Sequence, residues 1–217
     1  MAKSTVELVE KEKIIVIVRG VQTDKLLGLA EAMYKSGIRL LEITYSADGK
    51  MSDNDTAGNI AALKKHFGDE MSIGAGTVLT EKQVELTKDA GGEFIISPDS
   101  VPEVIKKTKE LNMVSIPGAL TPSEITLARR SGADFVKVFP ASNLGTDYIK
   151  AIKAPLSHIK LLAVGGINDK NMPDYLSAGV CGFGIGSNIV DKKLLAENDF
   201  EGITEMAKRY VSVIQSF

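Results

Sequence analysis

The sequence predicts an α/β fold, a (β/α)8 TIM barrel, and three observations support this prediction. Apolar runs and amphipathic segments alternate about eight times over 217 residues, roughly the length of a small barrel. The connecting loops are short, and no linker, low-complexity run or charge block divides the chain. The first apolar run is followed by residues 19–22 (RGVQ), which lack the glycine fingerprint usual in an open doubly wound sheet. We therefore expect a single barrel domain over residues 1–217.

The expected strands are apolar runs of the kind that a parallel sheet buries on both faces. The first covers residues 13–20, and the second, at 40–44, carries Glu42 in its middle. The sixth expected strand carries Lys137 in its middle in the same way. Pro140 ends this strand, because proline cannot continue the hydrogen-bond ladder. The remaining strands are expected at residues 71–78, 94–97, 113–117, 159–164 and 182–185.

The expected helices show apolar residues at helical spacing between recognisable end signals. Thr23 or Asp24 is expected to cap the first, which ends at Ser36-Gly37. Thr121 and Glu124 have the spacing of a capping box, and the helix that they open ends near residue 132. The other helices are expected at residues 54–67, 81–90, 101–111, 146–152, 170–177 and 203–215. The polar segment 46–55 is the one long loop.

Composition excludes several classes of function. A net charge of −2 and a pI near 5.8 give no electrostatic reason to expect nucleic acid or an acidic membrane as partner. Cys181 is the only cysteine, and residues 1–4 resemble neither a signal peptide nor a spanning segment, so the cytoplasm is the simplest location. His66 and His158 are the only histidines, and they lie far apart in expected surface regions. The sequence therefore argues against a histidine metal site and against a histidine-based catalytic triad.

Lys137 is the first candidate for chemistry. Side chains alternate along a strand, so Phe135, Lys137 and Phe139 share one face. If that face points into a closed interior, burial lowers the pKa of the amine, and a neutral amine is a nucleophile. The alternative is a lysine on a sheet edge or one that extends to solvent.

Glu42 is the natural partner of this lysine. In barrels of this class the chemistry lies at the carboxyl ends of the strands, where Arg19, Glu42, Thr44 and Thr77 also fall. A lysine amine converts a ketone into an iminium, and a nearby carboxylate moves the protons. The alternative for Glu42 is a structural ion pair with Lys137 or Arg19.

Two glycine stretches follow the last two expected strands, at residues 164–168 (VGGIN) and 184–188 (GIGSN). Barrels frequently bind phosphate at this place through backbone N–H groups, and glycine permits the close approach of the anion. Glycine also serves ordinary turns, but the position of both stretches favours a phosphate site.

Taken together, these motifs resemble the class I 2-keto-3-deoxy-6-phosphogluconate / 4-hydroxy-2-oxoglutarate aldolase family over nearly the whole chain. The matching segments are residues 41–44, 74–79, 96–98, 116–124, 135–141 and 164–167. The resemblance implies a homotrimer of barrels that reversibly cleaves a 2-keto-4-hydroxy acid into pyruvate and an aldehyde, without metal or other cofactor.

By the same resemblance, Lys137 would form the Schiff base with the keto carbon and Glu42 would be the acid and base. The residues expected to bind substrate are Arg19, Thr77, Pro98, Phe139, Gly165, Gly166, Gly186 and Ser187, with the glycines and the serine at the phosphate. The family pattern has an arginine four residues after the glutamate, where it helps to hold the substrate carboxylate, and this chain has Ser46. Lys50, Arg19 or backbone amides are candidates to replace it.

The leading hypothesis is an aldolase of phosphorylated 2-keto-3-deoxy sugar acids, with 4-hydroxy-2-oxoglutarate as a second substrate. One alternative is a sugar-phosphate isomerase or epimerase that uses Glu42 as its base and Lys137 as an electrostatic helper. Another is a non-catalytic phosphosugar-binding protein, which a ligand would stabilise without turnover.

Overall fold

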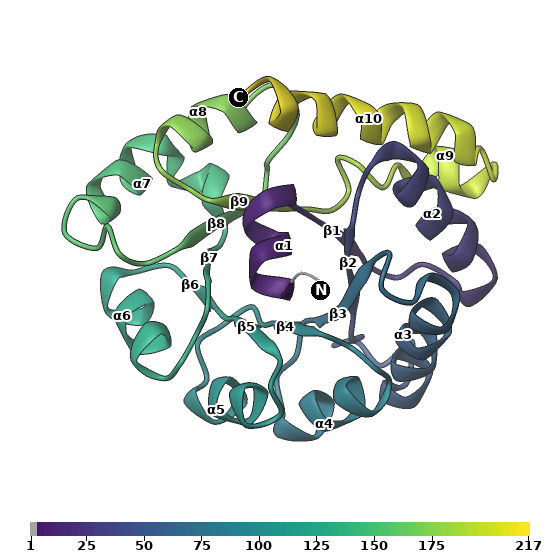
Figure 1. The fold of residues 1–217 in the computed structure, drawn as a ribbon, viewed down its shortest axis with the longest axis horizontal. Helices are drawn as coiled ribbons and strands as arrows, with labels where there is room; N and C mark the ends of the chain where they lie inside the picture. Colours follow the sequence, from purple (N-terminus) through teal and green to yellow (C-terminus); the bar gives the residue numbers. More distant parts are fainter. Residues whose placement is uncertain (1–3) are drawn as a thin grey trace.

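The computed structural model describes residues 4–217, and most of the short N-terminal stretch 1–4 lies outside them. Nine parallel strand segments form one ring, in the order β5-β4-β3-β2-β1-β9-β8-β7-β6, with the helices outside it (Figure 1). This arrangement confirms the predicted (β/α)8 barrel. The strands are β1 (Ile14–Val18), β2 (Leu40–Thr44), β3 (Ser72–Gly76), β4 (Phe94–Ile96), β5 (Val114–Ile116), β6 (Gly118–Ala119), β7 (Val136–Val138), β8 (Leu161–Val164) and β9 (Gly182–Ile185).

The helices alternate with these strands. They are α1 (Thr5–Glu12), α2 (Thr23–Ser36), α3 (Asp53–Phe67), α4 (Glu81–Asp89), α5 (Pro102–Glu110), α6 (Pro122–Arg130), η1 (Ala141–Asn143), α7 (Gly145–Lys153), α8 (Met172–Ser177), α9 (Lys192–Ala196) and α10 (Phe200–Ser216). The helix start that the sequence predicts at Thr121 is confirmed, because Thr121 and Glu124 form both hydrogen bonds of a capping box at the N-terminus of α6. The predicted cap of α2 is wrong: Gln22 is the N-cap, and its side chain makes no capping hydrogen bond.

The fifth strand differs from the expected run 113–117, because Pro117 divides it into β5 and β6. Proline has no N–H for the ladder, so the strand is interrupted at that residue. The ring nevertheless closes here. The backbone N–H of Lys137 donates to the carbonyl of Pro117 at 2.8 Å, and that of Phe135 donates to Ser115 at 3.3 Å. The strand that carries Lys137 is therefore the closing strand of the barrel.

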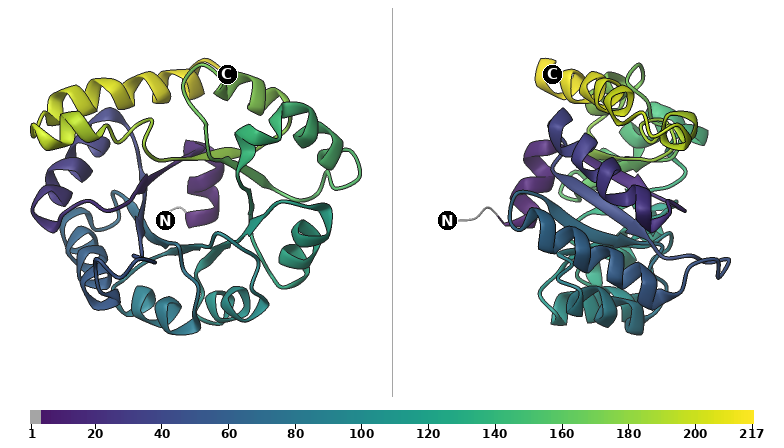
Figure 2. Two further views of the ribbon diagram at one scale, coloured as in Figure 1. Left: turned by 180° about the vertical axis from the view of Figure 1, so that it is seen from behind. Right: turned by 90° about the vertical axis from the view of Figure 1, so that its right-hand side faces the viewer.

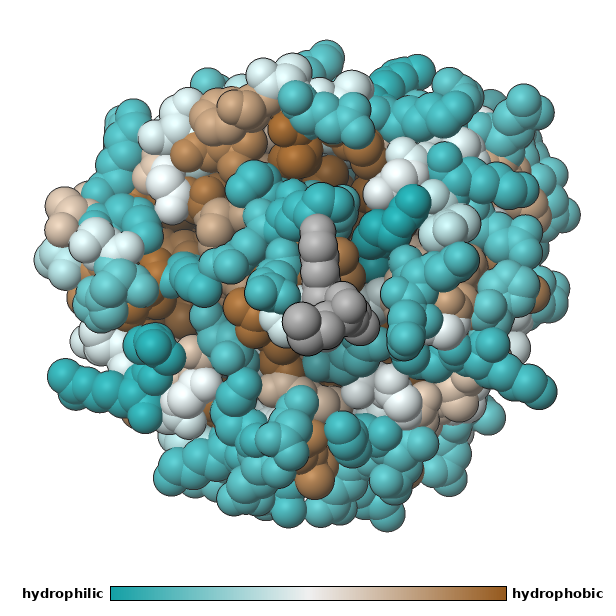
Figure 3. Space-filling view, viewed as in Figure 1, coloured by the Kyte–Doolittle hydropathy of each residue, from teal (hydrophilic) through white to brown (hydrophobic). Residues whose placement is uncertain are grey.

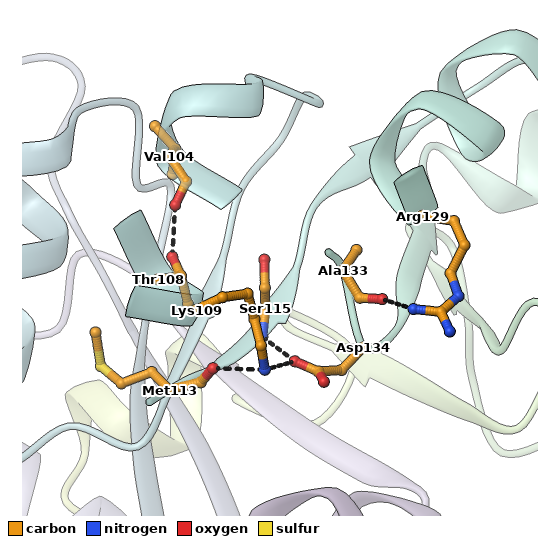
Figure 4. Close-up of polar contacts among 8 residues, drawn as sticks. All are labelled: Val104, Thr108, Lys109, Met113, Ser115, Arg129, Ala133 and Asp134. Carbon is orange, nitrogen blue, oxygen red and sulfur yellow. Dashed lines mark hydrogen bonds and ion pairs between the residues drawn. The ribbon is translucent and has the colours of Figure 1, made fainter. Parts of the chain in front are cut away.

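A polar cluster fixes the entry to this closing strand (Figure 4). The Asp134 carboxylate accepts hydrogen bonds from Lys109 Nζ at 2.6 Å and from the Ser115 N–H at 2.8 Å. The Asp134 N–H in turn donates to the Ser115 carbonyl at 3.0 Å. These contacts tie the end of α5 and the start of β5 to Asp134, two residues before β7, so the register of β7 is held from its N-terminal side.

The short helix α1, which the sequence analysis did not predict, covers the N-terminal end of the barrel. It crosses the centre of the ring in Figure 1, and Val9 packs against interior residues such as Ile15 and Leu40. Figure 3 shows mainly hydrophilic side chains over this face, with apolar patches between them. The side view in Figure 2 shows the segment between β2 and α3 projecting from the opposite end. That opposite end, where the strands finish, remains open for a site.

Side chains sort into an inner and an outer core. The inner core fills the barrel with Phe94, Ile96, Phe135, Leu162 and their neighbours, and the outer core packs the strands against the helices. Along β7 the face of Phe135 is thus the interior face. No helix within residues 4–217 is long and apolar enough to cross a bilayer.

Candidate active site

Lys137 lies in the middle of β7, hydrogen-bonded between β6 and β8, and only 7% of it is exposed. Phe135, two residues earlier and on the same face, is fully buried in the inner core. Phe139 lies at the mouth with 41% exposed, and its ring centroid is 5.0 Å from Lys137 Nζ. Lys137 is therefore neither on a sheet edge nor extended to solvent.

Burial lowers the pKa of Lys137 from its usual value, and this is the largest influence on the group. The negative charge of Glu42 opposes the shift, while the positive charge of Arg19 adds to it and Asp99 opposes it weakly. A larger fraction of the amine is therefore neutral near neutrality than in an exposed lysine. This is the protonation state in which an amine attacks a carbonyl carbon.

Glu42 lies in the middle of β2 and is 2% exposed. Burial raises its pKa to about 7, against the lowering effects of Lys137 and Arg19. Its Oε2 has no hydrogen-bond partner within the described chain, and no ion pair within 4.0 Å joins it to Lys137 or Arg19 there. The structural ion pair that the sequence allowed is thus not formed. A buried carboxyl that titrates near neutrality can both accept and release a proton.

Gly76 makes room for this carboxylate. It pairs with Thr44 on the neighbouring strand, and a Cβ placed on Gly76 would occupy the position of the Glu42 carboxylate. We expect Gly76→Ala to displace the Glu42 carboxylate and to lower kcat/KM about 100-fold for a reaction that uses this group, because misplacing a reacting group by about 1 Å lowers the rate by about this factor. Gly58→Ala in α3, where nothing lies within 4 Å of the added methyl group, is the matched control and should keep full activity. Steady-state kinetics of the two folded variants test this.

The raised pKa of Glu42 also predicts how stability depends on pH. The folded state holds the proton of Glu42 more tightly than the unfolded chain does. The protonated side chain therefore makes its full contribution to the free energy of unfolding below about pH 4.5, and this contribution is lost as the pH rises through about 7. In Glu42→Gln this dependence is absent. The unfolding free energy of the variant relative to wild type should therefore increase by on the order of 3 kcal/mol from acid to neutral pH. Urea unfolding at both pH values measures the difference, and a constant difference would contradict it.

A cavity of about 430 Å³ lies at the carboxyl ends of the strands, and we call it the substrate cavity. Lys137 and Glu42 do not line it themselves, but Phe139, whose ring centroid is 5.0 Å from Lys137 Nζ, forms part of its wall. All eight residues expected to bind substrate line it: Arg19, Thr77, Pro98, Phe139, Gly165, Gly166, Gly186 and Ser187. Arg19 Nη2 donates to Thr77 Oγ1 at 3.1 Å across its mouth. The cavity thus combines one cation with two glycine stretches at the ends of β8 and β9.

The glycine stretches have a backbone that suits close approach of a ligand. Gly165 and Gly166 have φ values of 94° and 71°, in the left-handed region that favours glycine. A side chain on Gly166 would also collide with that of Ser142 in η1. Asn188 Nδ2 donates to the Ile167 carbonyl at 2.7 Å and so ties the two stretches together. The sequence analysis missed Ser142, which directly follows the segment 135–141, and it gave no role to Asn188, although Asn188 ends the stretch 184–188.

A second cavity, of about 590 Å³, lies beside the first between the ends of β1 and β2 and the loop before α3. We call it the outer cavity. Arg19 lines both cavities, whereas Ser46 and Lys50 line only the outer one. Asp48 accepts a hydrogen bond from Ser46 Oγ at 2.5 Å and pairs with Lys50 at 2.7 Å. The Lys50 side chain is 85% exposed, so of the two side chains suggested as replacements for the family arginine only Arg19 reaches the substrate cavity.

Comparisons with known proteins agree with this geometry. The family model described as "Aldolase: KDPG and KHG aldolase" matches residues 6–206. A probable 2-dehydro-3-deoxy-6-phosphogalactonate aldolase of Rhizobium meliloti is 37% identical over 177 residues, 81% of each chain. A 2-dehydro-3-deoxy-phosphogluconate aldolase of Haemophilus influenzae is 32% identical over 222 residues, 99% of this chain and all of the other.

Solved structures give the same result. A KDPG aldolase from Legionella pneumophila, with pyruvate captured at low pH as a covalent carbinolamine intermediate, superposes with a TM-score of 0.85 at 29% identity. The match covers 96% of this chain and 98% of that one. A native KDPGal structure matches with a TM-score of 0.84 at 32% identity over 94% of both chains. The chain therefore belongs to the KDPG and KHG aldolase family.

Proposed function

We propose that this protein is a class I aldolase that reversibly cleaves a phosphorylated 2-keto-3-deoxy sugar acid to pyruvate and glyceraldehyde 3-phosphate, and that 4-hydroxy-2-oxoglutarate is a second substrate. The observation that carries the proposal is the pair of buried ionisable groups inside the barrel. Lys137 has a lowered pKa and Glu42 a pKa of about 7, and both lie on the interior face of their strands. Nucleophile and acid–base group are the two parts that Schiff-base cleavage requires.

The chemistry follows from these two groups. Lys137 Nζ adds to the C2 carbonyl, the carbinolamine loses water, and the resulting iminium withdraws electrons from the C3–C4 bond. Glu42 takes the proton of the C4 hydroxyl, so that the bond breaks, the aldehyde leaves and the electron pair forms an enamine. Protonation of C3 gives the pyruvate iminium, and water then releases pyruvate and regenerates the amine.

The walls of the substrate cavity would orient the substrate. The backbone of Gly165, Gly166 and Gly186, with Ser187, would hold the phosphate, as the left-handed glycines and the loop ends favour. Thr77 and Pro98 would line the pyruvate end, and Phe139 would pack beside the iminium. Arg19 would supply positive charge at the mouth.

The test is to follow pyruvate release with lactate dehydrogenase and NADH. The substrates are 2-keto-3-deoxy-6-phosphogluconate, its C4 epimer 2-keto-3-deoxy-6-phosphogalactonate, and 4-hydroxy-2-oxoglutarate, because relatives are named for each sugar acid. We expect release from at least one phosphorylated substrate with a higher kcat/KM than from the unphosphorylated acid. Binding without pyruvate release would indicate a phosphosugar-binding protein, and an isomeric sugar phosphate as product would indicate an isomerase or epimerase.

The proposal extends to assembly and location. We infer one barrel domain over residues 1–217 that acts as a homotrimer in the cytoplasm. The family resemblance supports the trimer, and the exposed apolar side chains Leu79 and Leu120, which follow β3 and β6, offer a surface for subunit contact. Light scattering after size-exclusion chromatography measures the mass of the assembly, and a monomer would contradict the trimer.

A further inference from the structure

We propose that the Thr44 hydroxyl donates a hydrogen bond to the carboxylate of the keto acid and, together with Arg19, determines the preference for an acid over a neutral ketone. This inference rests on the proposed function. In a 2-keto acid the carboxylate is bonded directly to the carbon that Lys137 attacks. Its binding partners must therefore lie at the mouth of the barrel close to Lys137 and Glu42.

Thr44 has the required position. It is the last residue of β2, two residues after Glu42 and on the same interior face, and it pairs with Gly76 on β3. Only 6% of the residue is exposed. Thr44 also lines the outer cavity together with Arg19, which forms part of the substrate cavity as well. A group bound at the junction of the two cavities would thus be near both side chains.

The Thr44 hydroxyl has no hydrogen-bond partner among residues 4–217. The other buried threonines of this part of the chain all donate to a backbone carbonyl: Thr56 to Ser52 at 3.2 Å, Thr87 to Gln83 at 2.7 Å and Thr108 to Val104 at 2.7 Å. Glu42 Oε2 is the one fully buried side-chain N or O atom without a partner among the described residues, so Thr44 Oγ1 keeps some access to the outer cavity and is free to bind a ligand there. The exception among these threonines is therefore at the position where a polar ligand is expected.

Other polar side chains around the outer cavity are already engaged or lie too far out. Ser46 donates to Asp48, and Lys50 pairs with the same carboxylate in solvent. Asn59, 4% exposed, directs its amide nitrogen to Met51 Sδ at 3.5 Å. Arg19 uses Nη2 on Thr77 and retains further N–H groups. Gln22 also lines the cavity but is exposed just before α2, and Asn59 lies in α3, so Arg19 for charge, directly after β1, and Thr44 for a directed hydrogen bond, at the end of β2, are the pair at the strand ends beside Glu42.

The test measures how adduct formation at Lys137 under borohydride depends on the concentration of pyruvate and, separately, of methyl pyruvate, which keeps the ketone but has no carboxylate. Thr44→Val keeps the shape of the side chain and removes the hydroxyl. We expect the half-saturating pyruvate concentration to rise about ten- to a hundredfold, as for loss of a hydrogen bond to a charged group, with no change for methyl pyruvate. Thr44→Ser should restore most of the pyruvate affinity, and Thr108→Val, which removes a buried hydroxyl in α5, should leave both curves unchanged.

Three results would overturn the inference. Unchanged pyruvate binding in Thr44→Val, with wild type forming the adduct, would exclude a carboxylate contact. An equal loss for pyruvate and methyl pyruvate would show that Thr44 acts on Lys137 or Glu42 instead. If wild-type protein formed no adduct with either ketone, the proposed function itself would fail and the inference with it, and this outcome is distinct from the first two.

Discussion

Replacing Lys137 by methionine is expected to lower kcat/KM for the phosphorylated keto acid at least about 10⁴-fold, because Lys137 is the only buried lysine among residues 4–217 and the proposed iminium forms on its amine. Methionine has a similar length and suits the buried position, so the barrel should still fold. Steady-state pyruvate release measures the loss, and circular dichroism checks the fold. Lys137→Arg should be equally inactive, since a guanidinium keeps the charge but does not add to a ketone.

The chain offers a matched control in Lys160. Its Nζ also lies over an interior aromatic ring, 5.5 Å from the centroid of Phe135, but it pairs with Glu10 at 2.5 Å and is half-exposed. Lys160→Met should therefore keep wild-type kinetics. Substantial activity in both Lys137 variants would contradict the Schiff-base account and favour an isomerase in which Lys137 acts only through its charge.

Replacing Glu42 by glutamine is expected to lower kcat about 10²- to 10⁴-fold, the usual contribution of a positioned acid or base. Glutamine fits the same space beside Gly76 but cannot take the C4 proton. The pH profile distinguishes this role from a structural one. Wild-type kcat/KM should fall as the pH drops through about 7, because the carboxylate becomes protonated, and in Glu42→Gln that part of the profile should disappear.

Glu42→Asp provides the complementary variant. It keeps a carboxylate but withdraws it from Lys137, so we expect activity between those of wild type and Glu42→Gln with the pH dependence preserved. A Glu42→Gln enzyme within about fivefold of wild-type kcat would contradict the proposed proton transfer, since a general base contributes far more than this.

The inward position of Lys137 and Glu42 was predictable from strand periodicity together with the predicted closed barrel. Glu42 and Lys137 each interrupt an apolar run, and each alternates with residues of the outer core such as Ile43 and Val136. In a closed parallel barrel the remaining face has only one place to point, which is the interior. The neighbouring positions of the two glycine stretches were predictable for a related reason, because the order of strands determines which loops are neighbours.

Other features depend on contacts that the sequence does not encode locally. Helix α1 did carry one local signal, the capping box of Ser4 and Glu7, which the sequence analysis missed. The helix spans only 8 residues and buries Val9 alone, so the rest of its pattern is weak without the barrel end that it covers. The division of the fifth strand at Pro117 depends on whether a neighbouring strand would need a backbone N–H at that position, which proline lacks. Likewise, Lys50 was a reasonable substitute for the missing arginine until the structure showed it paired with Asp48.

The measurement that tests the central claim most directly is the intact mass of the protein after incubation with pyruvate and borohydride. Wild type and Lys160→Met should each gain one pyruvate-sized increment that peptide mapping places on Lys137, and Lys137→Met should gain none. An adduct that persists in Lys137→Met, or wild-type protein that remains unmodified at millimolar pyruvate, would contradict the assignment of Lys137 as the Schiff-base lysine.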